Sequence, residues 1–444
     1  MSSHALAWSS ACLPLALLLL RPGVALAVPS FAEQTGQPCA ACHVGAFGPQ
    51  LKQYGRDFKL NGYVSNDGKP HGLPLAVSTQ VSFTHTDAAQ PGPAAPHFAA
   101  NDNFAIDQTS LYYAGRIAPR VGGFVQITYD GIAHQLHIDN TDIRYARDRE
   151  LFGEDLVYGF TVNNNPTVTD LWNSTPVWGF PYNSSALAPT PLAAALIDGG
   201  LGERVAGVGG YTMWNNLVYF EVDLYRGLGY DVLNSTGIVP VANTDKTTGA
   251  IPYWRLALQR EFGRSYLQVG TYGLSASVLP GGVDIPGRVD RFTDTALDAN
   301  YQFTANPKIV TSDMISAHAT FIHEDASLRA SEIIGGARVS HGLNTLRADV
   351  SYSLGATVTP SIQYFRTSGT NDAVYWGTPN GSPNSSGIIT EIAYVPWGKP
   401  DSLISWGNVR FAAQYVSYFR FDGASNNASA NNALYVTVWA AAHF

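Results

Sequence analysis

An alternation of apolar and polar side chains runs through Leu75-Ala76-Val77-Ser78-Thr79-Gln80-Val81-Ser82-Phe83-Thr84. A period of two residues is that of a β-strand, whose side chains point alternately to opposite faces. Most of the apolar residues share one face and most of the polar residues the other, with Thr79 as the polar exception on the apolar face. The segment has about the ~9–11 residues with which a tilted strand crosses a bilayer. We therefore expect a membrane strand here.

The same pattern recurs to the end of the chain, in residues 123–129, 216–226, 253–261, 265–273, 346–354 and 409–421. The turn-rich segments between strands differ greatly in length, from Gly355-Ala356 to residues 367–387 and 423–432. Short periplasmic turns that alternate with long outer loops produce such a difference. About sixteen or seventeen strand-like segments follow residue 74, and bacterial barrels close with an even number, so we predict sixteen. If the later long loops are outside, the hairpins predicted for residues 292–354 place the long loop 279–290 on the periplasmic side. Either one segment there is not a strand, or this loop breaks the rule.

The N-terminus has the features of an export signal. An apolar run over residues 13–20 is too short to span a bilayer, and Ala25-Leu26-Ala27 is the small-x-small pattern of a cleavage site. We predict that residues 1–27 are a signal peptide. Cleavage of the signal peptide would remove Cys12, so Cys39 and Cys42 are the two cysteines expected in the mature chain.

The composition fits a chain whose surface faces lipid. Charged residues make up 14% of the sequence, well below the roughly 25% of soluble domains. After residue 27 no stretch reaches the ~20 apolar residues of a membrane helix, so a chain that crosses the membrane must close its strands into a barrel. The last residue, Phe444, is similar to the aromatic last residue of bacterial outer-membrane barrels. A soluble β-sandwich or propeller is the alternative, and it leaves the signal, the low charge and Phe444 unexplained together.

These patterns predict a mainly all-β fold: a transmembrane antiparallel β-barrel of about 16 strands over residues 74–444, in the bacterial outer membrane and in contact with its lipid. A small α-helical domain over residues 28–73 precedes the barrel. The formal net charge of −8 and the isoelectric point near 5.7 argue against a nucleic-acid partner, which needs a basic surface.

Cys39-Ala40-Ala41-Cys42-His43 is a C-x-x-C-H haem-attachment motif. Two thiols at this spacing can each add to a vinyl group of haem, and the adjacent histidine then lies beneath the iron as an axial ligand. The alternatives are a thioredoxin-like C-x-x-C, which lacks its βαβ context here, and half of a zinc site, which lacks a second cysteine pair. We predict one covalent haem c, attached to Cys39 and Cys42, with His43 on the iron.

The segment that carries the motif is too small to fold firmly by itself, so haem burial and contacts with the barrel would have to stabilise it. Leu51, Tyr54 and Phe58 form one apolar stripe of a helix predicted over Pro49–Leu60. Asn61-Gly62 ends that helix. It would either cover one edge of the haem or pack as an ordinary core helix.

The N-terminal region resembles a known family. The residues concerned are Pro29-Ser30-Phe31-Ala32-Glu33-Gln34-Thr35-Gly36, then the C-x-x-C-H motif, then Tyr54-Gly55-Arg56-Asp57-Phe58-Lys59-Leu60-Asn61-Gly62-Tyr63. They are similar to the fused monohaem cytochrome–porins of the outer membrane, whose characterised members oxidise ferrous iron. The resemblance implies one haem c in a cytochrome plug inside or beneath the barrel. It also implies electron flow from the outside to the periplasm.

We accordingly expect an electron conduit, an Fe(II):cytochrome c oxidoreductase, that takes electrons from extracellular Fe(II) and passes them to a periplasmic cytochrome or other carrier. Ferric iron precipitates near neutral pH, so a cell gains by leaving that product outside and importing only the electron. Two alternatives stay open. The conduit could serve a different donor or acceptor, or the chain could be a diffusion porin in which haem is a structural plug or a sensor. Motifs of hydrolases and nucleotide-dependent enzymes do not occur.

The second axial ligand of the haem iron is less determined. The mature chain offers Met213 and Met314 and ten histidines including His43, of which His71 and His85 are nearest in sequence. We rank His71 first, because the small domain could supply it without the barrel, although an exposed or lumen-lining histidine is the better explanation of both His71 and His85.

Histidines and carboxylates also gather in residues 130–144, from Asp130 to Arg144, around an expected turn. Such mixed nitrogen and oxygen ligands suit ferrous iron. We favour the alternative, a polar lumen lining in which Arg144 offsets the acids. His318 and His323 lie five residues apart, so on one strand they face opposite sides and do not share a metal.

Overall fold

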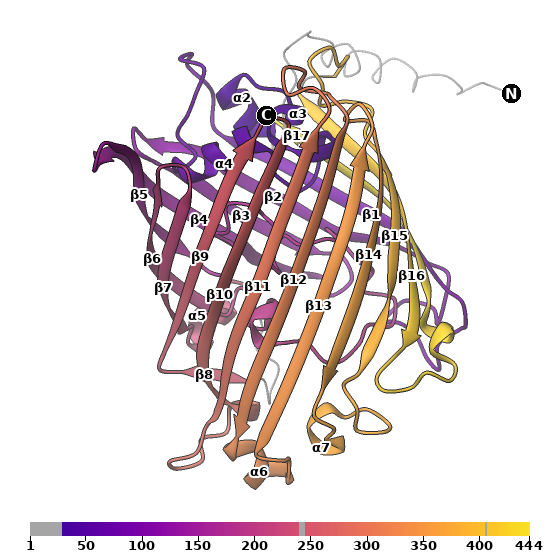
Figure 1. The fold of residues 1–444 in the computed structure, drawn as a ribbon. Helices are drawn as coiled ribbons and strands as arrows, with labels where there is room; N and C mark the ends of the chain where they lie inside the picture. Colours follow the sequence, from indigo (N-terminus) through magenta and orange to yellow (C-terminus); the bar gives the residue numbers. More distant parts are fainter. Residues whose placement is uncertain (1–28, 239–244, 405) are drawn as a thin grey trace, which may run out of the picture.

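The computed structural model describes residues 29–238, 245–404 and 406–444. The predicted signal peptide, residues 1–27 with Cys12, lies outside the described residues. The remainder of the chain forms a β-barrel with short helices at both ends (Figure 1).

Within the described residues, one antiparallel sheet holds every strand. Sixteen long strands follow each other around the barrel, and the three-residue strand β8 pairs with the end of β10. The predicted number of strands is confirmed. The strands are β1 Leu75–Thr86, β2 Asn103–Ala118, β3 Val121–Asp130, β4 Gln135–Leu151, β5 Glu154–Asn163, β6 Val205–Trp214, β7 Val218–Gly227, β8 Lys246–Thr248, β9 Ala250–Phe262, β10 Ser265–Leu279, β11 Asp290–Thr304, β12 Met314–Leu328, β13 Ser340–Ser353, β14 Val358–Gly369, β15 Ser385–Tyr394, β16 Gly407–Arg420 and β17 Ala433–His443.

The first and last strands close the barrel. β1 pairs antiparallel with β17 in an unbroken register from Ala76 opposite His443 to Thr86 opposite Ala433. An open edge would leave a row of backbone N–H and C=O groups unpaired in lipid, where nothing else can hydrogen-bond to them. The lipid environment therefore requires the sheet to close, as does the alternation of its side chains.

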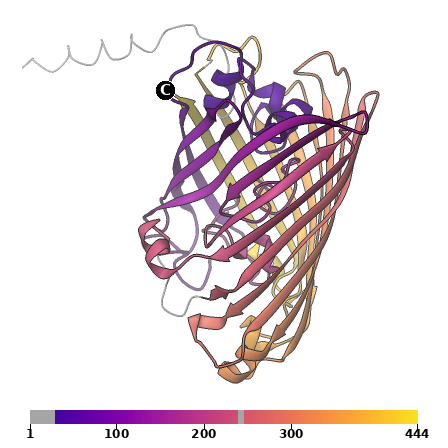
Figure 2. The same ribbon diagram turned by 90° about the vertical axis from the view of Figure 1, so that its left-hand side faces the viewer.

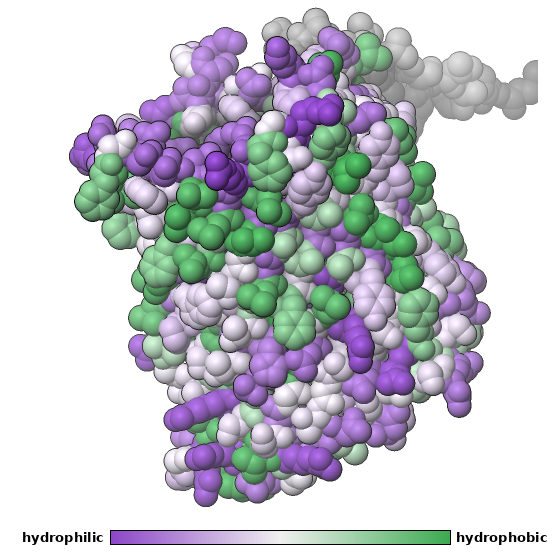
Figure 3. Space-filling model, in the orientation of Figure 1, coloured by the Kyte–Doolittle hydropathy of each residue, from purple (hydrophilic) through white to green (hydrophobic). Residues whose placement is uncertain are grey.

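The alternation in β1 separates the lumen from the lipid. Ser78, Gln80, Ser82 and Thr84 are buried on the lumen side, whereas Val81 is 39% exposed on the outer side. Other strands place large apolar side chains outward in the same way. These side chains gather across the barrel wall, and hydrophilic residues dominate at both ends (Figure 3). This belt matches the apolar band of an outer-membrane barrel.

The two ends of the barrel differ in the length of their connections. At the end that carries the C-terminus the chain turns within residues 119–120, 152–153 and 263–264. The opposite end has longer loops that hold α5 Tyr230–Ser235, η3 Pro280–Gly282, α6 Arg329–Gly335, α7 Ala373–Trp376 and η4 Ala428–Asn431. Because periplasmic turns are short and outer loops long, the C-terminal end is the periplasmic one.

The structure decides between the two alternatives for residues 279–290. The connection from β10 to β11 lies at the outer end, with α6 and α7, so this long loop follows the rule. One of the segments expected between residues 292 and 354 is therefore not a separate strand. The chain forms three strands there, β11, β12 and β13, each of 14 or 15 residues.

The N-terminal segment lies inside the periplasmic rim of the barrel (Figures 1 and 2). It contains α2 Pro29–Thr35, α3 Cys39–Cys42, η1 Val44–Ala46 and α4 Gln53–Leu60. It is hydrogen-bonded to lumen residues of three strands. Arg56 donates to Gln302 of β11 at 3.0 Å, and Tyr63 donates to Asp142 of β4 at 2.8 Å. The Tyr211 hydroxyl of β6 donates to the Leu60 carbonyl at 2.9 Å. None of the described helices has the length and apolar character that a membrane crossing requires.

The helix α4 is shorter than predicted. It begins at Gln53, because Leu51 pairs with His43 in an isolated β-bridge and so cannot join the helix. Tyr54 is 39% exposed and departs from the expected apolar stripe, whereas Leu51 and Phe58 are buried. The helix does end at Asn61-Gly62, where Gly62 has a φ of +73°.

Residues 164–204, between β5 and β6, fold back into the lumen. The loop includes the short turn η2 Leu196–Gly200 and bonds to strands on the far side of the barrel. Gln363 of β14 donates to the Phe180 carbonyl, and the Ile197 N–H donates to Asp294 of β11 at 2.6 Å. Together with α4, this loop fills much of the lumen.

An outward substitution tests the placement of the membrane. Leu297, in the middle of β11, is 60% exposed on the lipid side. Leu297→Arg should lower the free energy of unfolding in lipid vesicles by about 2–4 kcal/mol, the cost of an arginine near the bilayer midplane. Ile309→Arg, in the exposed periplasmic turn after β11, is the control and should cost little. Equal losses in urea titrations of both variants would contradict this placement.

Candidate functional site

The C-x-x-C-H motif forms a single helical turn. The His43 N–H donates to the Cys39 carbonyl at 2.9 Å, which closes α3. Residues three apart lie on one side of a helix, so Cys39 and Cys42 face the same way. α4 packs so closely on this turn that a Cβ on Gly55 would lie 2.7 Å from the Cys42 carbonyl oxygen. A glycine is therefore needed at that point of α4.

The barrel fixes the motif in place. The Ala40 N–H donates to the Gly398 carbonyl, in the turn between β15 and β16, at 2.9 Å. Asn408 of β16 donates its side-chain amide to the Ala46 carbonyl at 2.8 Å. These two hydrogen bonds hold the motif at the periplasmic end of the barrel, against β16 and the turn before it.

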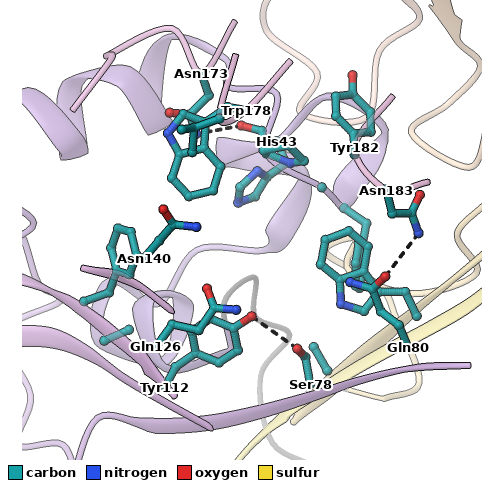
Figure 4. A pocket seen from close by; sticks show the side chains of 18 of the residues that line it. His43, Ser78, Gln80, Tyr112, Gln126, Asn140, Asn173, Trp178, Tyr182 and Asn183 are labelled. Carbon is teal, nitrogen blue, oxygen red and sulfur yellow. Dashed lines mark hydrogen bonds between the residues drawn. The ribbon is translucent and has the colours of Figure 1, made fainter. Parts of the chain in front are cut away.

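Both cysteines and His43 line a cavity of about 610 Å³. The His43 ring faces its open space, across which Asn140, Gln126 and Tyr112 lie on the strand wall (Figure 4). One wall, from the N-terminal helices, the lumen loop and β3 and β17, is mainly apolar: Phe31, Ala46, Phe47, Leu51, Phe58, Tyr63, Phe124, Trp178 and Trp439. The volume lies in the range of cofactor pockets, about 300–1,000 Å³.

The electrostatics of the motif favour neutral side chains. Burial lowers the pKa of His43 to about 4, so its imidazole is neutral at physiological pH, the form that binds metals. Burial raises the pKa of the Cys39 thiol and raises that of Cys42 to about 12.

The residues present fit a haem group. Two buried polar atoms of lining residues lack a hydrogen-bond partner: Asn183 Oδ1 and Trp439 Nε1. Buried polar groups are normally satisfied, so such atoms indicate a missing partner. Cys39 and Cys42, neither of which is in a disulfide, line the same cavity. Cys39, Cys42 and His43 would hold the haem against the apolar wall.

The structure does not bring the predicted second ligand to the cavity. His71 lies in the segment after α4, with its Nε2 2.6 Å from Asp67 Oδ1, and His85 pairs with Asp102 at the same distance. Met213 is buried among Leu60, Trp172 and Tyr211, and Met314 lies at the start of β12. Among the described residues that line the cavity, His43 is the sole histidine and methionine does not occur.

The lumen around α4 holds buried ion pairs. Arg144 Nε lies 2.8 Å from Asp142 Oδ2, and Arg255 lies 3.1 Å from Asp170 and 2.8 Å from Asp298. Asp170 belongs to the lumen loop, so Arg255 joins that loop to the wall. The pairing of Arg144 agrees with the polar lining favoured for residues 130–144.

The inward path of the lumen loop, residues 164–204, was not predicted. Its unusual length between two strands was a signal for an inward-folded segment.

Two further predicted histidines are now placed. His318 faces the lumen, where it bonds to Asp349 and to Gln50 at 2.8 and 2.9 Å. His323 bonds to Asn344 on the other face of β12. Their predicted opposite orientation is confirmed. Within residues 130–144, His137 and Asp139 lie close to each other and to Glu203. The sequence analysis did not single out Glu203.

Comparison with known proteins adds the fold class. No family model and no curated protein matches the sequence. Solved structures match the barrel: OmpT of Vibrio cholerae in its trimer form (9% identity, TM-score 0.43), the channel DcaP of Acinetobacter baumannii (10%, 0.44) and an anion-selective porin from Comamonas acidovorans (12%, 0.44). Each match covers 83% of this chain and 96–98% of the other. The strand order and closure define the chain as a 16-strand, porin-like barrel of the outer-membrane type.

Loss of the Arg255 ion pairs should destabilise the barrel. Arg255→Met leaves Asp170 and Asp298 buried without their cation, and breaking such a pair costs about 3–5 kcal/mol. We expect a loss of this size in urea unfolding, together with faster proteolysis of the lumen loop. Arg226→Met, at an exposed position of β7, is the control. An Arg255→Met variant as stable as the control would show that the loop is not fastened by these pairs.

Proposed function

We propose that this protein is an outer-membrane electron conduit that takes electrons from an extracellular donor, Fe(II) foremost, and passes them to a periplasmic carrier. The proposal rests on one observation: a C-x-x-C-H motif lines a cavity of about 610 Å³ within the periplasmic rim of a closed barrel. In reaction terms the protein would be an Fe(II):cytochrome c oxidoreductase.

Haem c would supply reversible one-electron chemistry at this site. Cys39 and Cys42, on one side of α3, would hold the haem covalently, and the neutral imidazole of His43 would bind its iron. The apolar wall keeps water from one face of the cavity, which tunes the potential of a buried redox group. The polar wall of the cavity, formed by β1 to β4, faces the lumen. It lies between the motif and the outer end of the barrel.

The position of the motif suits delivery to a periplasmic partner. α3 is bonded to the β15–β16 turn, at the end of the barrel where the short turns lie. A soluble cytochrome could approach this end without entering the lumen. The donor would be met from the side of the long loops, so the electron alone crosses the membrane and ferric product stays outside.

A second function deserves a test because the porin-like fold itself favours it: a diffusion porin in which haem is a plug or a sensor. The lumen loop and α4 oppose free diffusion. Three charged residues in this part of the lumen are fully buried: Asp170 of the lumen loop, Arg144 of β4 and Arg255 of β9. Their burial leaves little room for water around them. A conduit for another donor or acceptor is equally compatible with the cavity.

Anaerobic stopped-flow absorbance tests electron entry. The haem-loaded protein mixed with Fe(II) should show rapid growth of the reduced α-band, and His43→Ala should lose that reaction because the iron loses its axial ligand. His85→Ala, an exposed histidine outside the cavity, should react like the wild type. Haem staining of denatured protein checks covalent attachment in each variant. Reduction by dithionite without reduction by Fe(II) would reject Fe(II) as the donor.

Planar-bilayer conductance tests the porin alternative. The intact protein should conduct far less than an open sixteen-strand porin, and deletion of residues 166–201 should raise the conductance by clearing the lumen. Deletion of residues 91–97, in the outer loop between β1 and β2, is the control and should change little. An intact protein that already conducts like an open porin would favour the diffusion function.

A further inference from the structure

His137, Asp139 and Glu203 form a group of side chains apart from the haem motif. One ligand atom from each lies within 4.8 Å of the other two. His137 and Asp139 are two apart on β4, so both face the lumen. Glu203 comes from the returning end of the lumen loop, and its carboxylate lies 3.6 Å from His137 Nε2.

Hydrogen bonds fix this group in place. The Glu203 N–H donates to the Asn164 carbonyl at 3.0 Å, and the Asn164 side chain donates to the Asp139 carbonyl at 2.7 Å. Both ends of the lumen loop are thereby tied to β4. Asp139 Oδ2 accepts hydrogen bonds from Gln126 and Thr128 at 2.7 and 2.8 Å. Metal-binding carboxylates are commonly oriented by such outer partners.

Several other lumen acids pair with an arginine. Asp142 pairs with Arg144, Asp170 and Asp298 share Arg255, and Glu391 pairs with Arg410. Within the described part of the chain, Glu203 pairs with His137, and neither Asp139 nor Glu203 forms an ion pair with a lysine or arginine. The distinguishing feature of this group is its mixed donor set, because two carboxylates and one imidazole converge at a single point of the lumen.

The group borders the haem cavity. Asp139 and its neighbour Asn140 are lining residues of that cavity, and Figure 4 shows Asn140 and Gln126 across the open space from His43. β4 begins at the outer end of the barrel, so His137 lies on the outer side of the cavity. An ion held there would stand between the outer loops and the haem motif.

We propose that His137, Asp139 and Glu203 bind a divalent first-row transition-metal ion, for which mixed imidazole and carboxylate ligands are suitable. The further claim that this ion is the electron donor rests on the proposed function. In that case a bound Fe(II) would give up one electron and become Fe(III), and an oxidised haem held by Cys39, Cys42 and His43 would accept that electron. Only the two oxidation states change.

Isothermal titration with Zn²⁺ tests the site without any redox step, because zinc keeps one oxidation state. Using the haem-loaded full chain, we expect a binding event that weakens by at least roughly tenfold in Glu203→Gln and Asp139→Asn, since even outer partners of metal ligands are worth about 10–100-fold in affinity. Glu150→Gln, at the opposite end of β4, and His134→Ala, in the turn before β4, should bind as the wild type does. Circular dichroism verifies that each variant is folded.

Stopped-flow reduction then separates the two claims. If Fe(II) is the donor, Glu203→Gln should need a higher Fe(II) concentration for the same rate of haem reduction, while dithionite reduces both proteins alike. Zn²⁺ binding that is unaffected in both acidic variants overturns the metal site, whatever Fe(II) does. Zn²⁺ binding that depends on these residues, in a protein that Fe(II) never reduces, retains the site and overturns the iron-oxidising function.

Discussion

The closure of the barrel between β1 and β17 is the constraint on which the rest of the structure depends. In lipid each backbone N–H and C=O must find a partner in the protein, and a sheet achieves this only without free edges. Sixteen strands close around a lumen wide enough to admit a folded segment. The N-terminal helices and the loop 164–204 occupy that lumen, and the cavity forms where they meet the wall.

The cavity combines two chemically different walls because of this arrangement. The strand face that lipid does not contact is polar by the alternation of the strands, and it supplies Ser78, Gln126 and Asn140. The N-terminal segment has too little sequence for a core of its own, so it buries Phe31 and Phe58 against this same cavity. An apolar pocket around the motif thus borders a polar lumen, a setting suited to a redox group that exchanges electrons but not ions.

The strands were predictable from the sequence because their period-two pattern is local. Residues 216–226 and 409–421 lie almost wholly in β7 and β16, and the helix stop at Asn61-Gly62 follows from local backbone preferences. The C-x-x-C-H motif is also local, since it is contained in five residues, and its attachment of haem stays a prediction.

What the sequence left open depends on contacts between distant residues. Nothing near residue 203 shows that Glu203 meets His137, because the contact arises from the inward path of a long loop. The end of the barrel at which the loop 279–290 lies stayed open, because it depends on the exact number of strands between two loops. The start of α4 was misplaced because a bridge from Leu51 to His43 competes with the helix.

The central claim is that electrons cross this barrel while iron does not. Its most direct test places haem-loaded protein in sealed vesicles that contain a soluble cytochrome and an iron chelator, with Fe(II) added outside under anaerobic conditions. The account predicts that absorbance of the trapped cytochrome shows reduction while the trapped chelator remains free of iron. A cytochrome that stays oxidised until detergent opens the vesicles, or a chelator that fills with iron, would contradict it.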